Sequence, residues 1–154
     1  MTSARTQQPS AANYFEGELE GIRVFLLNRA ALAASDFDTL MELGMKSDEI
    51  ANRHLMRNGL GRQAEDEGDV DAAIAYHERN VAEMTGGSLP YERLRIIYRR
   101  RKQYDDAIRV CQRFVEMADR LIEMGSPRSN LQKKRQHFQD WIEKMTVQLT
   151  RTCF

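Results

Sequence analysis

Cysteine is scarce in this chain, and neither sign of charge is in excess. Only two of the 154 residues are cysteines, Cys111 and Cys153, which excludes a disulfide framework and favours a reducing, cytoplasmic location. Lysine plus arginine and aspartate plus glutamate number 23 each, so the net charge is zero. A neutral chain argues against generic polyanion binding. Apolar residues make up 42% and charged residues 30%, the ordinary balance of one globular domain with its own core.

Long apolar runs are missing as well. Residues 1–10 are small and polar, lack the apolar core of an export signal, and are expected to be disordered. The most apolar stretch, residues 21–34, contains Arg23, Asn28 and Arg29. It is therefore too short and too charged to cross a bilayer, and we predict no membrane association.

Motifs for catalysis and metal binding are also lacking. The three histidines, His54, His77 and His137, fall on different predicted helices, and no pair has a metal-ligand spacing. The chain has no phosphate-cradling glycine loop, no Gly-x-Ser-x-Gly elbow and no nucleophile–base set. We therefore predict no enzymatic activity, no catalytic residue, no bound metal and no cofactor.

The pattern of apolar residues predicts helices throughout. No long stretch alternates with a period of two, so strands are not expected and the fold class is all-α. Apolar residues recur every three to four positions over residues 12–34, which predicts an N-terminal helix. Ser35 is expected to cap a short helix that Gly44 ends, and Ser47 to restart the chain. Four later helices are expected to begin at Asp69, Ser88, Tyr104 and Ser126, with breaks at 85–87 and Gly125 and the last helix ending near residue 150.

Residues 54–121 repeat themselves at an offset of 34 residues. Six identities fall in register: Leu60/Leu94, Asp71/Asp105, Ala73/Ala107, Ile74/Ile108, Arg79/Arg113 and Val81/Val115. A period of this length is typical of stacked helical hairpins, in which each unit buries its apolar face on the next. His77 and Cys111 occupy matching places on the second helix of each copy, where we expect a side chain that faces the core.

The repeated residues resemble the tetratricopeptide-repeat (TPR) family. The first copy, residues 54–87, carries the family's Leu-Gly pair, turn and small alanine at Leu60, Gly61, Ala64, Gly68, Asp69, Val70 and Ala73. The second copy, residues 88–121, carries Leu94, Tyr98, Tyr104 and Ala107 at the matching places. Arg95 and Lys102 replace two glycines of the pattern in that second copy.

The resemblance implies a short right-handed superhelical array of antiparallel helix hairpins. Residues 11–53 would supply N-terminal helices and a possible degenerate repeat. Residues 126–150 would form a C-terminal capping helix that hides the apolar end of the array, and 151–154 a tail. Whether the N-terminal helix caps the array or occupies its groove stays open.

In this family the first helices of the hairpins line a concave groove that receives a segment of another protein. The resemblance places six residues in this groove: Asn58, Arg62, Arg93, Ile96, Arg99 and Arg100. Arginine offers paired donors that suit carboxylates. We therefore expect a non-enzymatic scaffold or adaptor that binds an acidic or amphipathic segment of a partner protein.

Nucleic-acid binding is an alternative that stays open. Residues 93–102 hold six cations and no acid, and clustered cations neutralise phosphates. The acids of residues 65–71 lie at the equivalent turn one repeat earlier, and stacked hairpins set such turns side by side. Asp66 and Glu67 would then lie near Arg100 and Arg101, which favours internal pairing over nucleic acid.

A homodimer or larger homo-oligomer through the terminal helices is the other alternative. The stripe of the last helix consists of Phe138, Trp141, Ile142, Met145 and Leu149. We expect this stripe to pack on residues 104–124, at Ile108, Val115 and Leu121 or Ile122. If it is partly exposed, its aromatic and methionine side chains suit the core of an interface.

Overall fold

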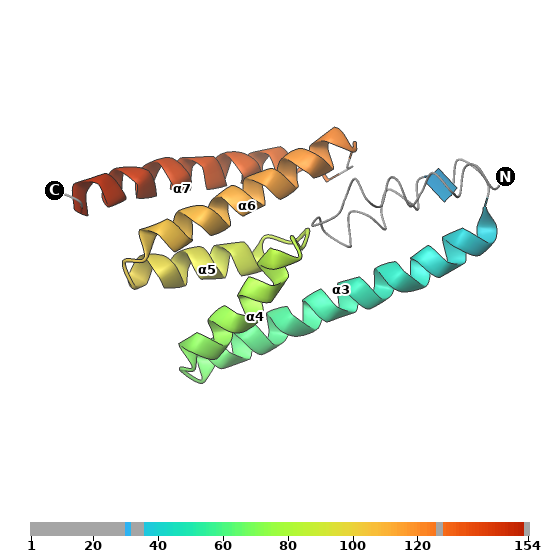
Figure 1. Ribbon diagram of the computed structural model, residues 1–154, viewed down its shortest axis with the longest axis horizontal. Coiled ribbons are helices and arrows are strands. Elements are labelled where there is room, and N and C mark those ends of the chain that lie inside the picture. Colours follow the sequence, from blue (N-terminus) through green and yellow to red (C-terminus); the bar gives the residue numbers. More distant parts are fainter. Residues whose placement is uncertain (1–29, 32–35, 126–127, 153–154) are drawn as a thin grey trace. The chain divides into compact units, whose positions relative to one another are not determined.

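The structure is a computed structural model, in which residues 30–31, 36–125 and 128–152 are described. It divides into an N-terminal unit, residues 1–56, and a C-terminal unit, residues 57–154. The helices are α3 (Phe37–Asp66), α4 (Val70–Ala82), α5 (Leu89–Arg100), α6 (Tyr104–Glu123) and α7 (Leu131–Thr152), and Figure 1 labels them. The described residues contain no strand, which confirms the all-α fold class. None of these helices is long and apolar enough to cross a membrane.

Helix α3 is longer than the sequence suggests. Asp36 caps it, because its carboxylate accepts hydrogen bonds from the Thr39 backbone N–H at 3.2 Å and the Thr39 hydroxyl at 2.7 Å. The helix then continues through Gly44 to Asp66, so the prediction that Gly44 ends a short helix is wrong. A helical glycine costs only about 1 kcal/mol relative to alanine, which the surrounding leucine, methionine and glutamate residues offset.

Two expectations for the N-terminal region lie outside the described residues. These are the predicted cap Ser35 and the predicted helix over residues 12–34. Of that helix only residues 30–31 are described, and both are helical.

The turns of the C-terminal unit follow the predicted chemistry in most places. Gly68 adopts a φ of +80°, and the Asp69 carboxylate accepts from the Ala72 N–H at 3.2 Å, which caps α4 as expected. Gly125 has a φ of +75° and follows the end of α6, also as expected. Both glycines occupy the left-handed region that other residues rarely adopt. These turns fix where the hairpins reverse.

One predicted cap lacks its hydrogen bond, and one predicted helix start is wrong. Ser88 is the N-cap residue of α5, as expected, but its side chain makes no capping hydrogen bond: its hydroxyl donates to Glu92 at 3.4 Å and accepts from the Lys134 ammonium at 2.8 Å. The last helix was expected to begin at Ser126, and α7 begins only at Leu131. The preceding residues, 128–130, form a turn, held by a hydrogen bond of 2.5 Å from the Arg128 guanidinium to the backbone oxygen of Gly86.

Successive helices of the C-terminal unit lie against one another, α4 on α5, α5 on α6 and α6 on α7 (Figure 1). Ala73 and Ala107 are fully buried at equivalent places in α4 and α6. A small side chain there lets neighbouring helices approach closely. His77 and Cys111 are also fully buried, so the prediction that both face the core is confirmed.

The two repeats differ in residue size at one pair of matching positions, one on each helix of the hairpin. A Cβ atom added to Gly61 would lie 2.5 Å from the ring of His77, so the glycine leaves the space that the imidazole fills. In the second repeat Arg95 stands at the glycine position and Cys111 at the histidine position. The large side chain is therefore on the second helix in the first repeat and on the first helix in the second repeat. As a result, the guanidinium of Arg95 stands at the position that glycine occupies in the first repeat.

The matching leucines of the two repeats, Leu60 and Leu94, differ in burial. Leu94 is fully buried, because α5 lies between α4 and α6. Its counterpart Leu60 is 37% exposed, so the matching leucines do not share one environment. Within the C-terminal unit α3 is the first helix, and no preceding helix of that unit covers its outer side.

An aromatic cluster joins α5, α6 and α7. Phe114 stacks on Phe138 with ring centroids 3.9 Å apart, and Tyr91 meets Phe114 edge-on at 5.2 Å. Each such pair adds about 0.5–1.5 kcal/mol beyond its buried area. The prediction that the last helix packs on residues 104–124 is confirmed. The ring of Phe138 on this helix stacks on Phe114. Phe114 was not among the contacts predicted from the sequence, which were Ile108, Val115 and Leu121 or Ile122.

Candidate functional site

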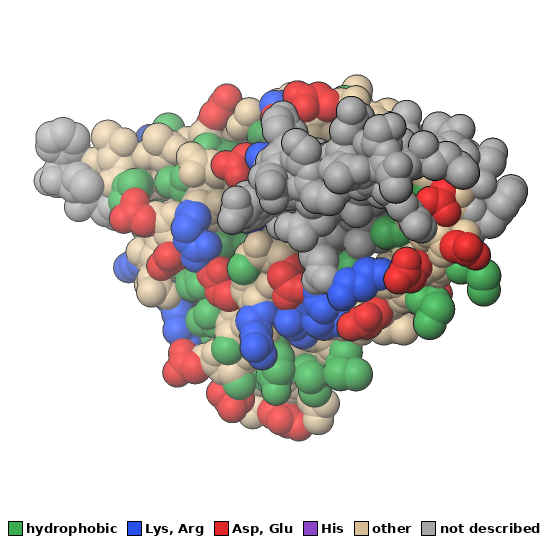
Figure 2. Space-filling model, turned by 45° about the vertical axis from the view of Figure 1, so that its right-hand side comes forward, with side chains coloured by type: hydrophobic (Ala, Val, Ile, Leu, Met, Phe, Trp, Pro, Cys, Tyr) green, Lys and Arg blue, Asp and Glu red, His purple; other side chains and the backbone are tan. Residues whose placement is uncertain are grey.

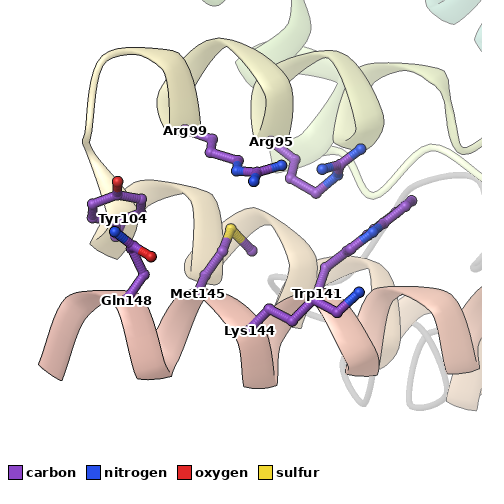
Figure 3. Close-up of a pocket in the computed structure, with 7 residues that line it drawn as sticks. All are labelled: Arg95, Arg99, Tyr104, Trp141, Lys144, Met145 and Gln148. Atoms are coloured by element: carbon purple, nitrogen blue, oxygen red, sulfur yellow. The ribbon is translucent and has the colours of Figure 1, made fainter. Parts of the chain in front are cut away.

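Helices α5 and α7 enclose a pocket of about 190 Å³ (Figure 3). Its lining consists of Arg95 and Arg99 from α5, Tyr104 from the start of α6, and Trp141, Lys144, Met145 and Gln148 from α7. Three of these side chains are cationic and none is acidic. Tyr104, in the first turn of α6, lies at one end of the pocket. The charged side chains that line the pocket are all positive.

Arg95 is held over the ring of Trp141. Its guanidinium carbon lies 3.7 Å from the ring centroid, a distance at which the face of an indole attracts a cation. Arg95 Nε is buried and has no hydrogen-bond partner among the described residues. Burial lowers the pKa of the Arg95 guanidinium below its ordinary value, and the charge of Arg99 acts in the same direction. The site thus holds a cation that forms no ion pair with the described part of the chain.

The aromatic cluster fixes the position of Trp141. The Trp141 and Phe138 rings meet edge-on with centroids 4.8 Å apart, and Phe138 is itself fully buried against Phe114. Met145, one helical turn beyond Trp141, is also buried. Trp141 is therefore a preorganised platform for Arg95, because its neighbours belong to the core of the unit.

A second hollow of about 420 Å³ adjoins this pocket along α5. Arg95, Ile96, Arg99 and Arg100 line it, so the two depressions share Arg95 and Arg99. Together they make a basic face, which we call the α5 basic face: Arg95, Ile96, Arg99, Arg100 and Lys144. Its cations make no ion pair with any residue that the structure describes.

The structure brings together three of the six predicted groove residues, Ile96, Arg99 and Arg100, on this face. Two others are held elsewhere. The side-chain oxygen of Asn58 accepts a hydrogen bond from Asn80 Nδ2 at 2.8 Å, and Arg93 forms an ion pair of 2.5 Å with Glu65.

The sixth predicted residue, Arg62, is exposed on α3. It does not line either depression.

The acidic and basic runs of the two repeats do meet, through partners other than the expected ones. Arg93 pairs with Glu65, and Arg101 pairs with Asp71 at 3.1 Å. The predicted pairing of Asp66 and Glu67 with Arg100 and Arg101 is therefore wrong in its details. Internal pairing uses both ends of the basic run and leaves its middle available.

A buried polar group links α3, α4 and α5. His77 Nε2 lies 3.2 Å from Glu65 Oε2. Arg93 Nε donates to both carboxylate oxygens of Glu65, and Arg93 Nη2 donates to Oε1. Burial lowers the pKa of His77, and the charges of Arg93 and Arg62 add to this effect, while Glu65 opposes it. Burial raises the pKa of Glu65, but hydrogen bonds from Arg93 and His77 outweigh burial and lower it overall. A neutral His77 therefore donates from Nε2 to an ionised Glu65.

The described cysteine, Cys111, is fully buried in the core. Burial raises the pKa of the Cys111 thiol to about 12, and Arg95 only partly opposes this, so the thiol stays protonated and unreactive at neutral pH. Within the described ranges, no group of three or more His, Cys, Asp or Glu residues could hold a metal ion.

Helix α3 exposes large apolar side chains in the N-terminal unit. Met41 and Met45 are 74% and 73% exposed, and Leu55 and Met56 are 69% and 67% exposed. Figure 2 shows a face on which exposed hydrophobic side chains lie among acidic and basic ones.

The sequence-based prediction missed most of the pocket. Arg95, Tyr104, Trp141, Lys144, Met145 and Gln148 were not among the predicted site residues. One signal in the sequence could have identified Arg95. In the repeat alignment Arg95 matches Gly61 and Cys111 matches His77, so the large residue of this pair is on the first helix in the second repeat.

Comparison of the chain with protein families, with curated proteins and with solved structures gives no match in any of the three.

Proposed function

We propose that the C-terminal unit is a non-enzymatic protein-interaction module that binds an acidic segment of a partner protein along the α5 basic face. One observation carries this proposal: Arg95, Arg99, Arg100 and Lys144 converge on adjoining depressions that no acidic side chain lines. Arginine and lysine without internal partners suit carboxylates, and Ile96 supplies an apolar contact between them.

The proposal includes a TPR-like superhelical arrangement of the hairpins. It is supported by the 34-residue repeat, by the buried alanines Ala73 and Ala107, and by the order in which α4, α5, α6 and α7 lie against one another. Helix α7 would then act as the capping helix and also supply one wall of the binding site.

Preorganisation is the mechanism by which such a face would gain affinity. Trp141 holds Arg95 in place before a ligand arrives, so less side-chain entropy is lost on binding. An acidic segment that crosses α5 could pair with Arg99 and Arg100, which are both exposed, and place one anionic side chain in the pocket beside Arg95.

Other arginines of the unit are already paired. Arg109 contacts Glu78 at 2.5 Å, and Arg135 contacts Asp119 at 2.5 Å. Since Arg93 and Arg101 are paired as well, the basic run offers fewer phosphate contacts than its sequence suggests. This supports a short acidic peptide over a nucleic acid, whose affinity would need many phosphate contacts.

Native capture from cytoplasmic extract, read by mass spectrometry, tests the proposal. The double variant Arg99→Glu/Arg100→Glu reverses two charges on the face. A matched control, Arg79→Glu/Lys133→Glu, reverses two exposed charges on α4 and α7 that line neither depression. We expect proteins captured by wild type and by the control to be lost with the α5 variant. Equal capture by all three folded forms would contradict the proposal.

Homo-oligomerisation is a second proposed function, favoured by the exposure of Met41, Met45, Leu55 and Met56 on α3. Methionine and leucine at such exposure suit the core of an interface. If α3 joins two copies, the mass from light scattering will rise with concentration, and Met45→Glu/Met56→Glu will hold the chain at the monomer mass. A wild-type chain that stays monomeric at all concentrations would contradict this function.

A further inference from the structure

The pocket between α5 and α7 carries more positive charge than one carboxylate can neutralise. Arg95, Arg99 and Lys144 line it without an acid, so a single aspartate or glutamate would leave two charges uncompensated. A phosphorylated side chain carries about −1.5 to −2 charges and three acceptor oxygens. Two guanidinium groups and an ammonium group match that set of acceptors.

The guanidinium of Arg95, which lines the pocket, points to the same kind of ligand. Arg95 Nε is buried and has no hydrogen-bond partner among the described residues, although burying a charged group without one is costly. Trp141 supplies an attractive ring face but no acceptor oxygen. An anionic oxygen next to Arg95 would complete the site.

The volume of the pocket sets the size of the ligand. About 190 Å³ is below the roughly 300–1,000 Å³ of sites for drug-sized molecules, so a nucleotide does not fit well. One long or phosphorylated side chain does. Tyr104 and Gln148 add polar groups to the rim of the same pocket.

We propose that this pocket binds a phosphorylated serine or threonine side chain of the partner protein, through Arg95, Arg99 and Lys144. The inference depends on the proposed protein-binding function. The α5 basic face would hold the acidic segment, and the pocket would select those segments that carry a phosphate. Phosphorylation of the partner would then switch binding on by adding charge-assisted hydrogen bonds.

Intrinsic fluorescence gives a direct readout, because Trp141 is the chain's only tryptophan and lines the pocket. The full-length chain is titrated at constant ionic strength with inorganic phosphate and, separately, with acetate. It is then titrated with two synthetic acidic peptides that differ only in a central phosphoserine or glutamate. The variants are Arg99→Gln and Lys144→Gln. Arg79→Gln is the matched control, since Arg79 is also exposed but lines neither depression.

We expect saturable fluorescence changes with phosphate and with the phosphopeptide. Both should bind about tenfold tighter than acetate and the glutamate peptide, since extra charge-assisted hydrogen bonds form. Arg99→Gln and Lys144→Gln should weaken phosphopeptide binding by about tenfold each, and Arg79→Gln should leave phosphopeptide binding unchanged.

Four results would overturn the inference, and they separate it from the proposed function. Equal affinity for both peptides would remove the phosphate selectivity and leave acidic-segment binding intact. Equal losses in all three variants would show a diffuse charge effect and no pocket. Binding of neither peptide, or tighter binding of single-stranded RNA than of the phosphopeptide, would overturn both proposals.

Discussion

Arg95 lies with its guanidinium carbon 3.7 Å from the centre of the Trp141 ring, and this contact joins α5 to α7. It has two consequences. The cation is held at the wall of a pocket that no described acidic side chain lines, and α7 becomes part of the proposed binding site.

The Arg95–Trp141 contact should contribute measurably to stability. A double-mutant cycle with Arg95→Met and Trp141→Leu, followed by urea denaturation, is expected to give a coupling free energy of about 0.5–2 kcal/mol. A coupling of zero would mean that the two side chains are neighbours without a favourable interaction, and Trp141 would no longer explain the position of Arg95.

The close approach of Gly61 to His77 predicts opposite effects for two glycines of α3. Gly61→Ala should destabilise the chain by about 1–3 kcal/mol, because its Cβ would meet the imidazole at 2.5 Å. Gly59 has nothing within 4 Å of the same added atom, so Gly59→Ala should stabilise the helix by up to about 1 kcal/mol. Denaturant unfolding followed by circular dichroism measures both. Similar values for the two variants would contradict the packing described here.

The buried alanines of the repeats test the stacking of the hairpins. Ala73→Leu should lower the melting temperature, since an over-packed core loses about 1–3 kcal/mol and each kcal/mol shifts a domain of this size by several degrees. Ala75→Leu, at an exposed position of the same helix, should have little effect. An unchanged melting temperature for Ala73→Leu would rule out the repeat packing.

The state of His77 predicts how stability depends on pH. Its pKa is lowered in the folded chain from the ordinary 6.5, so the unfolded chain binds the proton first as the pH falls. Stability is therefore complete above about pH 6.5 and declines below it, by at most about 1.4 kcal/mol per pH unit for this one group. The lowered pKa of Glu65 adds a further loss below about pH 4.5.

His77→Gln provides the control for this pH dependence. Glutamine can still donate a hydrogen bond to Glu65 but does not titrate. Unfolding free energies measured from pH 7.5 to 5 should fall more steeply for wild type than for the variant. Parallel curves would show that His77 keeps its ordinary pKa in the folded chain.

Much of the C-terminal unit could be predicted because its signals are local. Asp69, Gly68 and Gly125 set helix ends through backbone conformation and one side-chain hydrogen bond, which depend on neighbouring residues alone. The 34-residue period located the hairpins and the buried alanines. Gly44 misled the prediction because a glycine can end a helix or be tolerated within one, and the outcome depends on the residues around it.

The site was harder to predict because it depends on contacts between distant parts of the chain. Arg93 looked equivalent to Arg99 in sequence, yet Glu65, 28 residues earlier, holds Arg93 in an ion pair. Trp141 was expected to pack on the preceding helix, and its second role as the support of Arg95 depends on where α7 lies against α5. Side-chain partners of this kind are set by tertiary packing, which the local pattern does not encode.

Selection from a random peptide library tests the central claim most directly. Peptides of about twelve residues are selected on wild type and then compared on Arg99→Glu/Arg100→Glu and on the control Arg79→Glu/Lys133→Glu. The account predicts selected peptides rich in aspartate and glutamate that lose binding to the first variant and keep it with the second. Selected peptides without an acidic bias, or binding that survives charge reversal on α5, would contradict it.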